Sequence, residues 1–259
     1  MQKEEQLLEK RFIELSQLAY HRDIVTFSDF LNLNELNILH TLPKDSLYTR
    51  YITFGGYELA ERQIAAFIPD ALSLREEKDM YTYFEPEIRV LQISPLHAKY
   101  AEALNHRDYL GAILNLGIDR SKTGDILIND GKAVMFVKPK MCQFLTEELT
   151  RIRHTIVMTE ELPLQNFEYQ PHFQEIKGTV ASVRLDSLLS IAFSSSRSSL
   201  VGLIEGGKVF VNGKLITSNG YQVKEGDVIS VRGMGKFQFC ETLSRTKKNR
   251  IYVKINKYI

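Results

Sequence analysis

The sequence is poor in cysteine and has no long hydrophobic run. Its two cysteines, Cys142 and Cys240, lie far apart in the chain among apolar or aromatic residues, so we expect two buried free thiols and a cytoplasmic protein. No apolar run approaches the roughly 18 residues that cross a bilayer, so no membrane span is expected. The N-terminal stretch MQKEEQLLEKRF is charged and is not expected to be a secretory signal.

The short motifs of common metal-dependent and cofactor-dependent enzymes are also missing. The chain has no CxxC and no clustered His and Cys residues of the kind that bind zinc. It has no phosphate-loop motif, dinucleotide fingerprint, GxSxG or HExxH. The glycine pair Gly206-Gly207 is typical of a helix end. We therefore expect no cofactor, no metal ion and no catalytic residue.

Charge is distributed unevenly along the chain. From Arg184 to the C-terminus, 13 Lys and Arg residues stand against 5 Asp and Glu residues, a net charge of +8. Because the whole chain carries +1, residues 1–183 carry about −7 by difference. A basic segment that follows an acidic body is typical of a protein that binds a polyanion such as nucleic acid.

The basic segment has a clear order of predicted elements. The stretch RLDSLLSIAF has the apolar spacing of a one-sided helix, and Ser196 is a suitable N-cap for a second helix. Val209–Val211 and Val228–Val231 are predicted to be short strands. Asn212-Gly213 is the strongest two-residue hairpin signal. The predicted order is therefore helix, helix, strand, turn and strand.

Three stretches of this segment follow one another with short gaps: RLDSLL, SRSSLVGLIEGGKVFVNGK and EGDVISVRGMGKF. Together they resemble the RNA-binding domain named after the fourth small-subunit ribosomal protein, here called the S-four domain. The stretch HRDYLGAILNLGIDRSKTGDILI (His106 to Ile128) is similar to bacterial YlmH proteins, which end in such a domain. This resemblance covers nearly the whole chain. It implies binding to structured RNA, association with the large ribosomal subunit, and rescue of stalled subunits that still carry peptidyl-tRNA.

The resemblance and the apolar spacing predict an α+β chain of three small domains. Residues 1–75 are expected to form an N-terminal mixed α/β domain, and residues 76–165 a central RRM-like domain that is itself a candidate for RNA binding. A linker is expected at 166–182, followed by the S-four domain at 183–259.

Local patterns predict some of the elements upstream of the basic segment. In the N-terminal domain, Thr26–Phe30 is expected to begin a helix and Glu58–Phe67 to form another. In the central domain the predicted order is β-α-β-β-α-β, the split βαβ arrangement of ferredoxin-like folds, with the first helix at Ala98–Leu116. RNA-recognition folds share this arrangement, but so do many unrelated proteins.

The candidate RNA contacts are basic and small polar residues of the C-terminal segment. Each Lys or Arg that meets a phosphate releases condensed counterions, and the N-terminus of the second helix offers backbone amides to a phosphate. The candidates are Arg184, Ser196, Arg197, Ser198, Lys208, Asn212, Lys214, Arg232, Lys236, Lys247 and Lys248.

A solvated basic surface is the alternative interpretation of these residues. In that case Arg184 pairs with an acid such as Asp186. The turn role of Asn212 is sufficient to explain it without RNA. The run 245–250 would then be an ordinary solvated loop.

Arg107, Arg120 and Lys122 form a possible second RNA contact. The alternative is a structural network that pins the helix carrying His106 to the turn at Gly124-Asp125. Although His106 is close to Asp108 in a predicted helix, the side-chain direction turns by about 100° at each position, so the two side chains do not face each other and do not suggest a catalytic pair.

We expect a non-enzymatic protein that binds structured ribosomal RNA, with tRNA, on the large ribosomal subunit in rescue or quality control of stalled translation. One alternative is an RNA-modifying enzyme of the pseudouridine synthase or methyltransferase type, because S-four domains also accompany such enzymes. Another alternative is a partner-binding protein in cell division. The chain is expected to be a monomer with no DNA or membrane partner.

Overall fold

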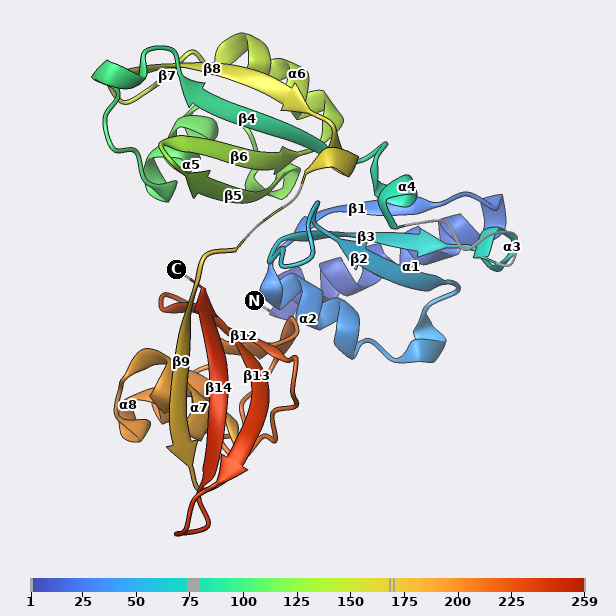
Figure 1. Cartoon of the computed structure of the whole chain (residues 1–259). Helices are drawn as coiled ribbons and strands as arrows, with labels where there is room; N and C mark the ends of the chain where they lie inside the picture. The colour runs from blue at the N-terminus through green and yellow to red at the C-terminus, as the bar shows by residue number, and fades with distance from the viewer. Residues whose placement is uncertain (1, 74–79, 168, 170, 259) are drawn as a thin grey trace. The chain divides into compact units, whose positions relative to one another are not determined.

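The computed structural model describes residues 2–73, 80–167, 169 and 171–258 (Figure 1). The chain divides into two compact units, Met1–Tyr169 and Gln170–Ile259. We call residues 1–75 the N-terminal subdomain and residues 76–165 the central subdomain of the first unit. Residues 170–259 are called the C-terminal unit.

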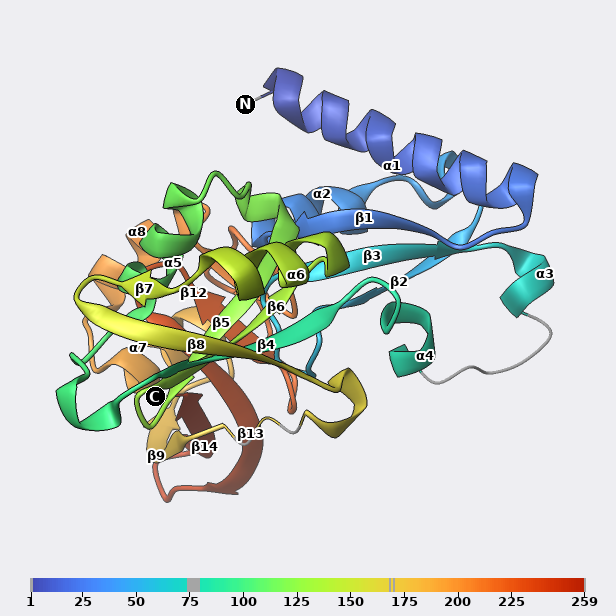
Figure 2. The ribbon, with the colours of Figure 1, turned by 90° about the horizontal axis from the view of Figure 1, so that it is seen from above.

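The N-terminal subdomain contains a three-stranded antiparallel sheet in the order β1-β3-β2. Helices α1 and α2 pack on one face of this sheet, where Phe12, Leu36 and Phe67 are fully or almost fully buried (Figure 2). Its elements are α1 (Gln2–Arg22), β1 (Thr26–Leu31), α2 (Leu33–Thr41), the 3-10 turn η1 (Lys44–Ser46), β2 (Arg50–Phe54), β3 (Gln63–Ile68) and α3 (Asp70–Ser73).

Two helix predictions in this subdomain are wrong, because both segments are drawn into the sheet. Thr26–Phe30 lies in strand β1, and Glu58–Phe67 contains most of strand β3. The two strands pair with each other, and the Ser28 hydroxyl accepts a hydrogen bond from the Ala65 amide at 2.9 Å. The apolar run of β3 is buried on both faces of the sheet, and this tertiary burial overrides the local helix tendency.

The central subdomain confirms the predicted β-α-β-β-α-β order. Its sheet runs β5-β6-β4-β8-β7, so β6 lies between β5 and β4 as in a split βαβ fold. Helices α5 and α6 cover one face of the sheet. The elements are α4 (Met80–Phe84), β4 (Arg89–Pro95), η2 (Ala98–Tyr100), α5 (His106–Asn115), η3 (Arg120–Lys122), β5 (Thr123–Asn129), β6 (Lys132–Val137), α6 (Pro139–Glu148), β7 (Arg151–Ile152), β8 (Thr155–Leu162) and η4 (Leu164–Asn166).

Helix α5 is shorter than predicted, because it begins at His106 and not at Ala98. Asn105 caps it in a capping box, in which the Asp108 carboxylate accepts a hydrogen bond from the Asn105 amide at 2.9 Å. His106, Arg107 and Asp108 therefore lie in the first turn of the helix, and Asp108 is used by the cap.

The N-terminal and central subdomains share a hydrophobic core and form one compact unit. Phe136 of β6 packs between the rings of Tyr57 and Phe167, at centroid distances of 5.3 and 5.2 Å. A Cβ atom on Gly56, whose φ is +102°, would lie 2.1 Å from the Phe136 ring, so this close approach requires glycine. The predicted division near residue 75 thus separates two sheets but not two compact bodies.

The C-terminal unit is a six-stranded antiparallel sheet, β11-β10-β12-β13-β14-β9, with two helices packed on it. The predicted helices, short strands and Asn212-Gly213 turn are all present. The elements are β9 (Phe173–Val180), α7 (Leu185–Phe193), α8 (Arg197–Glu205), β10 (Val209–Val211), β11 (Lys214–Leu215), β12 (Val228–Val231), β13 (Gly235–Arg245) and β14 (Ile251–Tyr258).

The predicted linker at 166–182 is wrong in its second half, which is strand β9. This strand pairs with β14 along its whole length, from Phe173 opposite Tyr258 to Val180 opposite Ile251. Gly178 allows helix α7 to lie close to the strand, because a Cβ atom there would come within 2.9 Å of the Ile191 side chain. Strand β9 is therefore part of the C-terminal fold.

In the part of the chain that the structure describes, no single helix is long and apolar enough to cross a membrane. Helices α7 and α8 reach the necessary length and hydropathy only as a pair, and they are bent by 119° at the break between them.

Candidate functional site

The N-terminus of helix α8 is built as the sequence predicts. Ser196 is the N-cap, and its hydroxyl accepts a hydrogen bond from the Ser199 amide at 3.4 Å. Ser196 and Ser198 are both exposed, with their hydroxyl oxygens 3.1 Å apart. Arg197 begins the helix, but its side chain lies outside the described residues. This end of α8 presents hydroxyl groups and backbone amides to solvent.

Three of the predicted cations lie close together in the sheet: Lys208 directly precedes β10, Arg232 directly follows β12, and Lys236 lies in β13. The Arg232 amide donates a hydrogen bond to the Lys208 carbonyl at 2.9 Å, so the two residues are neighbours. Strand register places Phe210 opposite Ser230, and Ser230 opposite Lys236. Directly opposed residues of an antiparallel sheet point to the same face. We call Lys208, Arg232 and Lys236 the cationic strip.

Two side chains of the cationic strip lie over aromatic rings. The Arg232 guanidinium lies 5.6 Å from the centre of the buried Phe210 ring, and the Lys236 ammonium lies 5.6 Å from the centre of the Tyr258 ring. Such cation–π contacts help to orient the charged groups. Arg232 and Lys208 are both exposed. The sequence analysis did not identify Phe210 or Tyr258 as neighbours of these cations, because only the strand register brings them together.

Other predicted cations of the C-terminal unit lie elsewhere or are already paired. Arg184 donates two hydrogen bonds to the buried carboxylate of Asp186, at 3.1 and 2.9 Å, which agrees with the structural alternative. Lys247 and Lys248 follow the far end of β13, roughly 30 Å from Lys236 at about 3.4 Å per residue (Figure 1). Lys214 is exposed on β11, opposite Val211.

The Asn212 side chain is tied to the start of the neighbouring strand β12. Its amide nitrogen donates to Asp227 at 2.8 Å, and its amide oxygen accepts from the Val228 amide at 2.9 Å. Asn212 and Gly213 have φ values of 48° and 78°, as a two-residue turn of the mirror-image type requires. The turn accounts for both residues.

The structure does not bring the second predicted set together at one site; this set is Arg107, Arg120 and Lys122. Arg120 donates to the carbonyl oxygens of Thr123 and Gly124 at 2.8 and 2.7 Å. Lys122 forms an ion pair with Asp29 of the N-terminal subdomain at 2.6 Å. These two side chains belong to a structural network, whereas Arg107 is exposed on helix α5.

The same network centres on Arg62, which the sequence analysis missed, and on Asp125 of the predicted Gly124-Asp125 turn. Arg62 donates to the carbonyl oxygens of Phe30, Arg120 and Thr123 at 3.0, 3.0 and 2.9 Å. Asp125 accepts hydrogen bonds from the Tyr57 hydroxyl at 2.9 Å and the Glu61 amide at 2.7 Å. The network therefore joins the N-terminal subdomain to the Gly124-Asp125 turn.

Burial in this network shifts the acid–base properties of its members. Burial, together with the nearby charge of Arg62, lowers the pKa of Arg120 to about 10. Burial and then the charge of Arg120 lower the pKa of His106 from its usual value. The lowered pKa favours the neutral form of this exposed imidazole.

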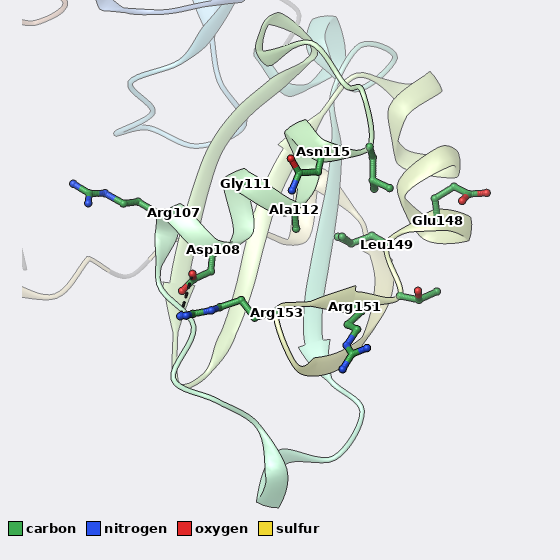
Figure 3. Close-up of a pocket in the computed structure, with 11 residues that line it drawn as sticks. Arg107, Asp108, Gly111, Ala112, Asn115, Glu148, Leu149, Arg151 and Arg153 are labelled. Atoms are coloured by element: carbon green, nitrogen blue, oxygen red, sulfur yellow. Dashed lines mark ion pairs between the residues drawn. The ribbon is translucent and has the colours of Figure 1, made fainter.

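Arg107 lies instead at a hollow of about 480 Å³ that the sequence analysis did not predict (Figure 3). The hollow lies between helix α5 and the edge strand β7, and Arg151 and Arg153 also line it. Arg153 forms ion pairs with Asp108 at 3.4 Å and with Glu102 at 3.9 Å. The alternation Arg151-Ile152-Arg153 was the only sequence signal for this cluster.

The sheet face that RRM domains use to stack RNA bases is partly covered in the central subdomain. Phe136 and Val90 of this face are completely buried against residues of the N-terminal subdomain such as Tyr57 and Phe54. Tyr57 in turn packs against Tyr169 at a centroid distance of 4.9 Å. The aromatic residues at this end of the face are therefore used for packing.

Neither a metal centre nor a disulfide is found among the side chains that the structure describes. Those residues contain no cluster of three His, Cys, Asp or Glu side chains that could hold a metal ion. Both cysteines are free, as predicted; Cys142 is buried and Cys240 is partly buried. Burial and the nearby Glu161 raise the pKa of the Cys142 thiol to about 11, which makes it a poor nucleophile near neutral pH.

Comparisons with known proteins agree with the two predicted RNA-binding modules. Residues 84–166 match the family model described as "Putative RNA-binding domain in YlmH", and residues 183–229 match the model described as "S4 domain". A curated relative, the ribosome-associated protein quality control protein P2 of Bacillus subtilis (strain 168), is 27% identical over 252 residues. That alignment covers 96% of this chain and 93% of the relative.

A solved structure, the cell division protein ylmH from Streptococcus pneumoniae, has a similar fold with a TM-score of 0.50. It is 22% identical and covers 64% of this chain and 95% of its own chain. The mixed α and β fold with a C-terminal S-four domain is thus confirmed, and so is the resemblance to YlmH proteins.

Proposed function

We propose that this chain, which carries the RNA-binding domain of YlmH and an S-four domain, binds structured RNA on the large ribosomal subunit without catalysing a reaction. The observation that carries the proposal is the cationic strip of Lys208, Arg232 and Lys236 within a module of net charge +8. The name of the Bacillus subtilis relative supports a ribosomal role in protein quality control.

The cationic strip and the N-terminus of α8 suit an RNA backbone better than a small ligand. Arg232 is exposed and held over Phe210, so its guanidinium keeps donors available for a phosphate. Ser196 and Ser198 add hydroxyl groups at a helix N-terminus, where the helix dipole favours an anion. Structured RNA is recognised largely through its shape, phosphates and 2′-hydroxyls. Ribosomal RNA, held together with tRNA, is the ligand that we propose.

A rescue role follows from the binding mode and not from chemistry at a catalytic centre. A protein that holds a stranded peptidyl-tRNA in place on a large subunit needs contact surfaces and no cofactor. The buried Cys142 thiol has a raised pKa, and the Asp108 carboxylate is used by the cap of α5, so neither side chain is expected to be a catalytic group. We propose that the chain acts as a monomer in the cytoplasm.

Charge reversal of the cationic strip tests the proposal. We expect Lys208→Glu with Arg232→Glu to weaken binding to purified large ribosomal subunits at least about tenfold, and to reduce the slope of log K against log salt by about 2. Both side chains are exposed, so circular dichroism should show an unchanged fold.

The matched control is Lys132→Glu with Lys140→Glu, which changes the net charge equally at exposed positions of the central subdomain. Its binding should stay within about twofold of the parent if local contacts matter more than total charge. Equal losses in both double variants, or no loss in either, would contradict the proposal.

A further inference from the structure

We propose that the hollow between α5 and β7 is a second RNA site, which binds a short single-stranded segment through Arg107 and Arg151. The inference rests on the proposed function, because it assumes an RNA ligand. It goes beyond that function, because it assigns residues on the helical side of the central subdomain and not on its sheet face. We call this site the arginine hollow.

The charges around the arginine hollow favour an anionic ligand. Arg107, on α5, and Arg151, on β7, are exposed, and no ion pair is found for either among the described residues. Arg153 lies between them and forms an ion pair with Asp108, so its charge is already paired (Figure 3). Glu148, at the other end of the hollow, carries the opposing charge. Figure 3 shows Arg107 extending outward from α5, away from the other lining residues, so its guanidinium lies at the outer edge of the hollow. Two available guanidinium groups at the edges of a hollow suit two anionic groups of one extended ligand.

The floor of the arginine hollow favours a nucleotide over a simple ion. Gly111 and Ala112 of α5 line it, together with Leu116 at the C-terminal cap of that helix and the buried Leu149. A Cβ atom on Gly111 would meet no heavy atom within 4 Å, so the floor is open at this point. Its volume of about 480 Å³ lies in the usual range of ligand sites, roughly 300–1,000 Å³. A small-residue floor accepts a flat base, and arginine rims can bind phosphates or stack on bases.

The packing of the first unit makes this side of the central subdomain the more accessible one for RNA. Phe136, on the opposite face of the sheet, is enclosed by Tyr57 and Phe167. The arginine hollow opens beside β7, which is the last strand of the sheet order. A second RNA contact on the same chain would raise the overall affinity for a large ligand without strengthening the first contact.

The test starts from the full chain that carries Lys208→Glu and Arg232→Glu, because in this parent the cationic strip contributes little to RNA binding. Its binding to a fluorescent single-stranded RNA of ten nucleotides and mixed sequence is followed by anisotropy. We expect Arg107→Glu with Arg151→Glu to weaken this binding at least about tenfold. Lys132→Glu with Lys140→Glu is the control of equal charge and should change binding less than about twofold.

A variant without charge change separates a binding site from general electrostatics. Gly111→Leu places a side chain in the open space of the hollow, where a Cβ atom would meet no heavy atom within 4 Å. Leucine is also a better helix former than glycine, so the chain should remain folded. We expect it to weaken RNA binding several-fold. Gln143→Leu, which adds an exposed leucine to α6 outside the hollow, should leave binding unchanged.

Unchanged RNA binding in both Arg107→Glu with Arg151→Glu and Gly111→Leu would overturn the inference. The same variants are also tested for binding of a polyglutamate peptide. If they bind RNA as the parent does but lose binding of this peptide, the inference is also overturned, because the hollow would then suit an acidic polypeptide. Either result leaves the proposed function standing, since that is judged from the cationic strip and large ribosomal subunits.

Discussion

At the scale of single residues, Arg62 shows how one side chain can join two sheets. Its guanidinium reaches the carbonyl oxygens of β1, of η3 and of the first residue of β5, which belong to both subdomains of the first unit. Burial lowers its pKa from the usual value, and the nearby Glu35 and Asp125 partly offset that effect. The charged form of the Arg62 guanidinium is thus stabilised by the neighbouring acids and by the carbonyl groups to which it donates hydrogen bonds.

Removing this side chain should destabilise the first unit. We expect Arg62→Ala to lower the free energy of unfolding by about 3 kcal/mol, because three carbonyl groups lose a charged donor. Urea denaturation followed by circular dichroism measures the change. Arg11→Ala is the control, since Arg11 is exposed and forms a 3.8 Å surface ion pair with Glu14; its effect should be below about 0.5 kcal/mol. Similar effects of the two variants would contradict the network.

The residue scale also shows which cations the sequence could and could not identify. Lys208, Arg232 and Lys236 were predicted as RNA contacts from motif and charge, but only strand register brings them to one strip. Arg151 was not singled out, because its charge lies in a chain region of acidic balance, where composition gives no signal. Folding places it across a hollow from Arg107, 44 positions earlier in the sequence.

At the scale of elements, the sequence predicted correctly those features that depend on nearby residues, but not the strands that pair with distant parts of the chain. The Ser196 cap and the Asn212-Gly213 turn depend on contacts within a few residues, and both are present as predicted. Strands β1 and β3 were predicted as helices, because their pairing is set by residues 37 positions apart, such as Ser28 and Ala65. A local pattern has no access to such contacts.

The hairpin between β10 and β11 yields a prediction that separates stability from RNA binding. We expect Gly213→Ala to lower the free energy of unfolding by about 1–2 kcal/mol, because φ at this position is 78° and a Cβ atom disfavours it. Affinity for large ribosomal subunits, measured where the protein remains folded, should stay within about twofold. A loss of affinity without a loss of stability would show that the turn itself contacts RNA.

At the scale of the whole molecule, the chain combines a compact two-sheet unit with a separate basic unit. The boundary between them precedes β9, although the sequence placed the S-four domain from residue 183 onward. Strand β9 contributes Val180 to the core and covers the edge of β14. The basic unit is therefore larger than the matched motif, which spans residues 183–229.

Two fragments test this boundary. We expect residues 170–259 to fold alone and to give a cooperative thermal transition, because they contain a complete core and the β9 edge strand. Residues 183–259 should be markedly less stable and prone to aggregation, because β14 then becomes an uncovered edge. Equal stability of the two fragments would show that β9 is dispensable.

The most direct test of the central claim is ultraviolet crosslinking of the full chain to large ribosomal subunits, with crosslinked peptides identified by mass spectrometry. We predict crosslinks to RNA in the peptides that contain the start of α8 and the cationic strip, near residues 196–208 and 232–236. Crosslinks confined to other parts of the C-terminal unit, or none in that unit while the first unit crosslinks, would contradict the account.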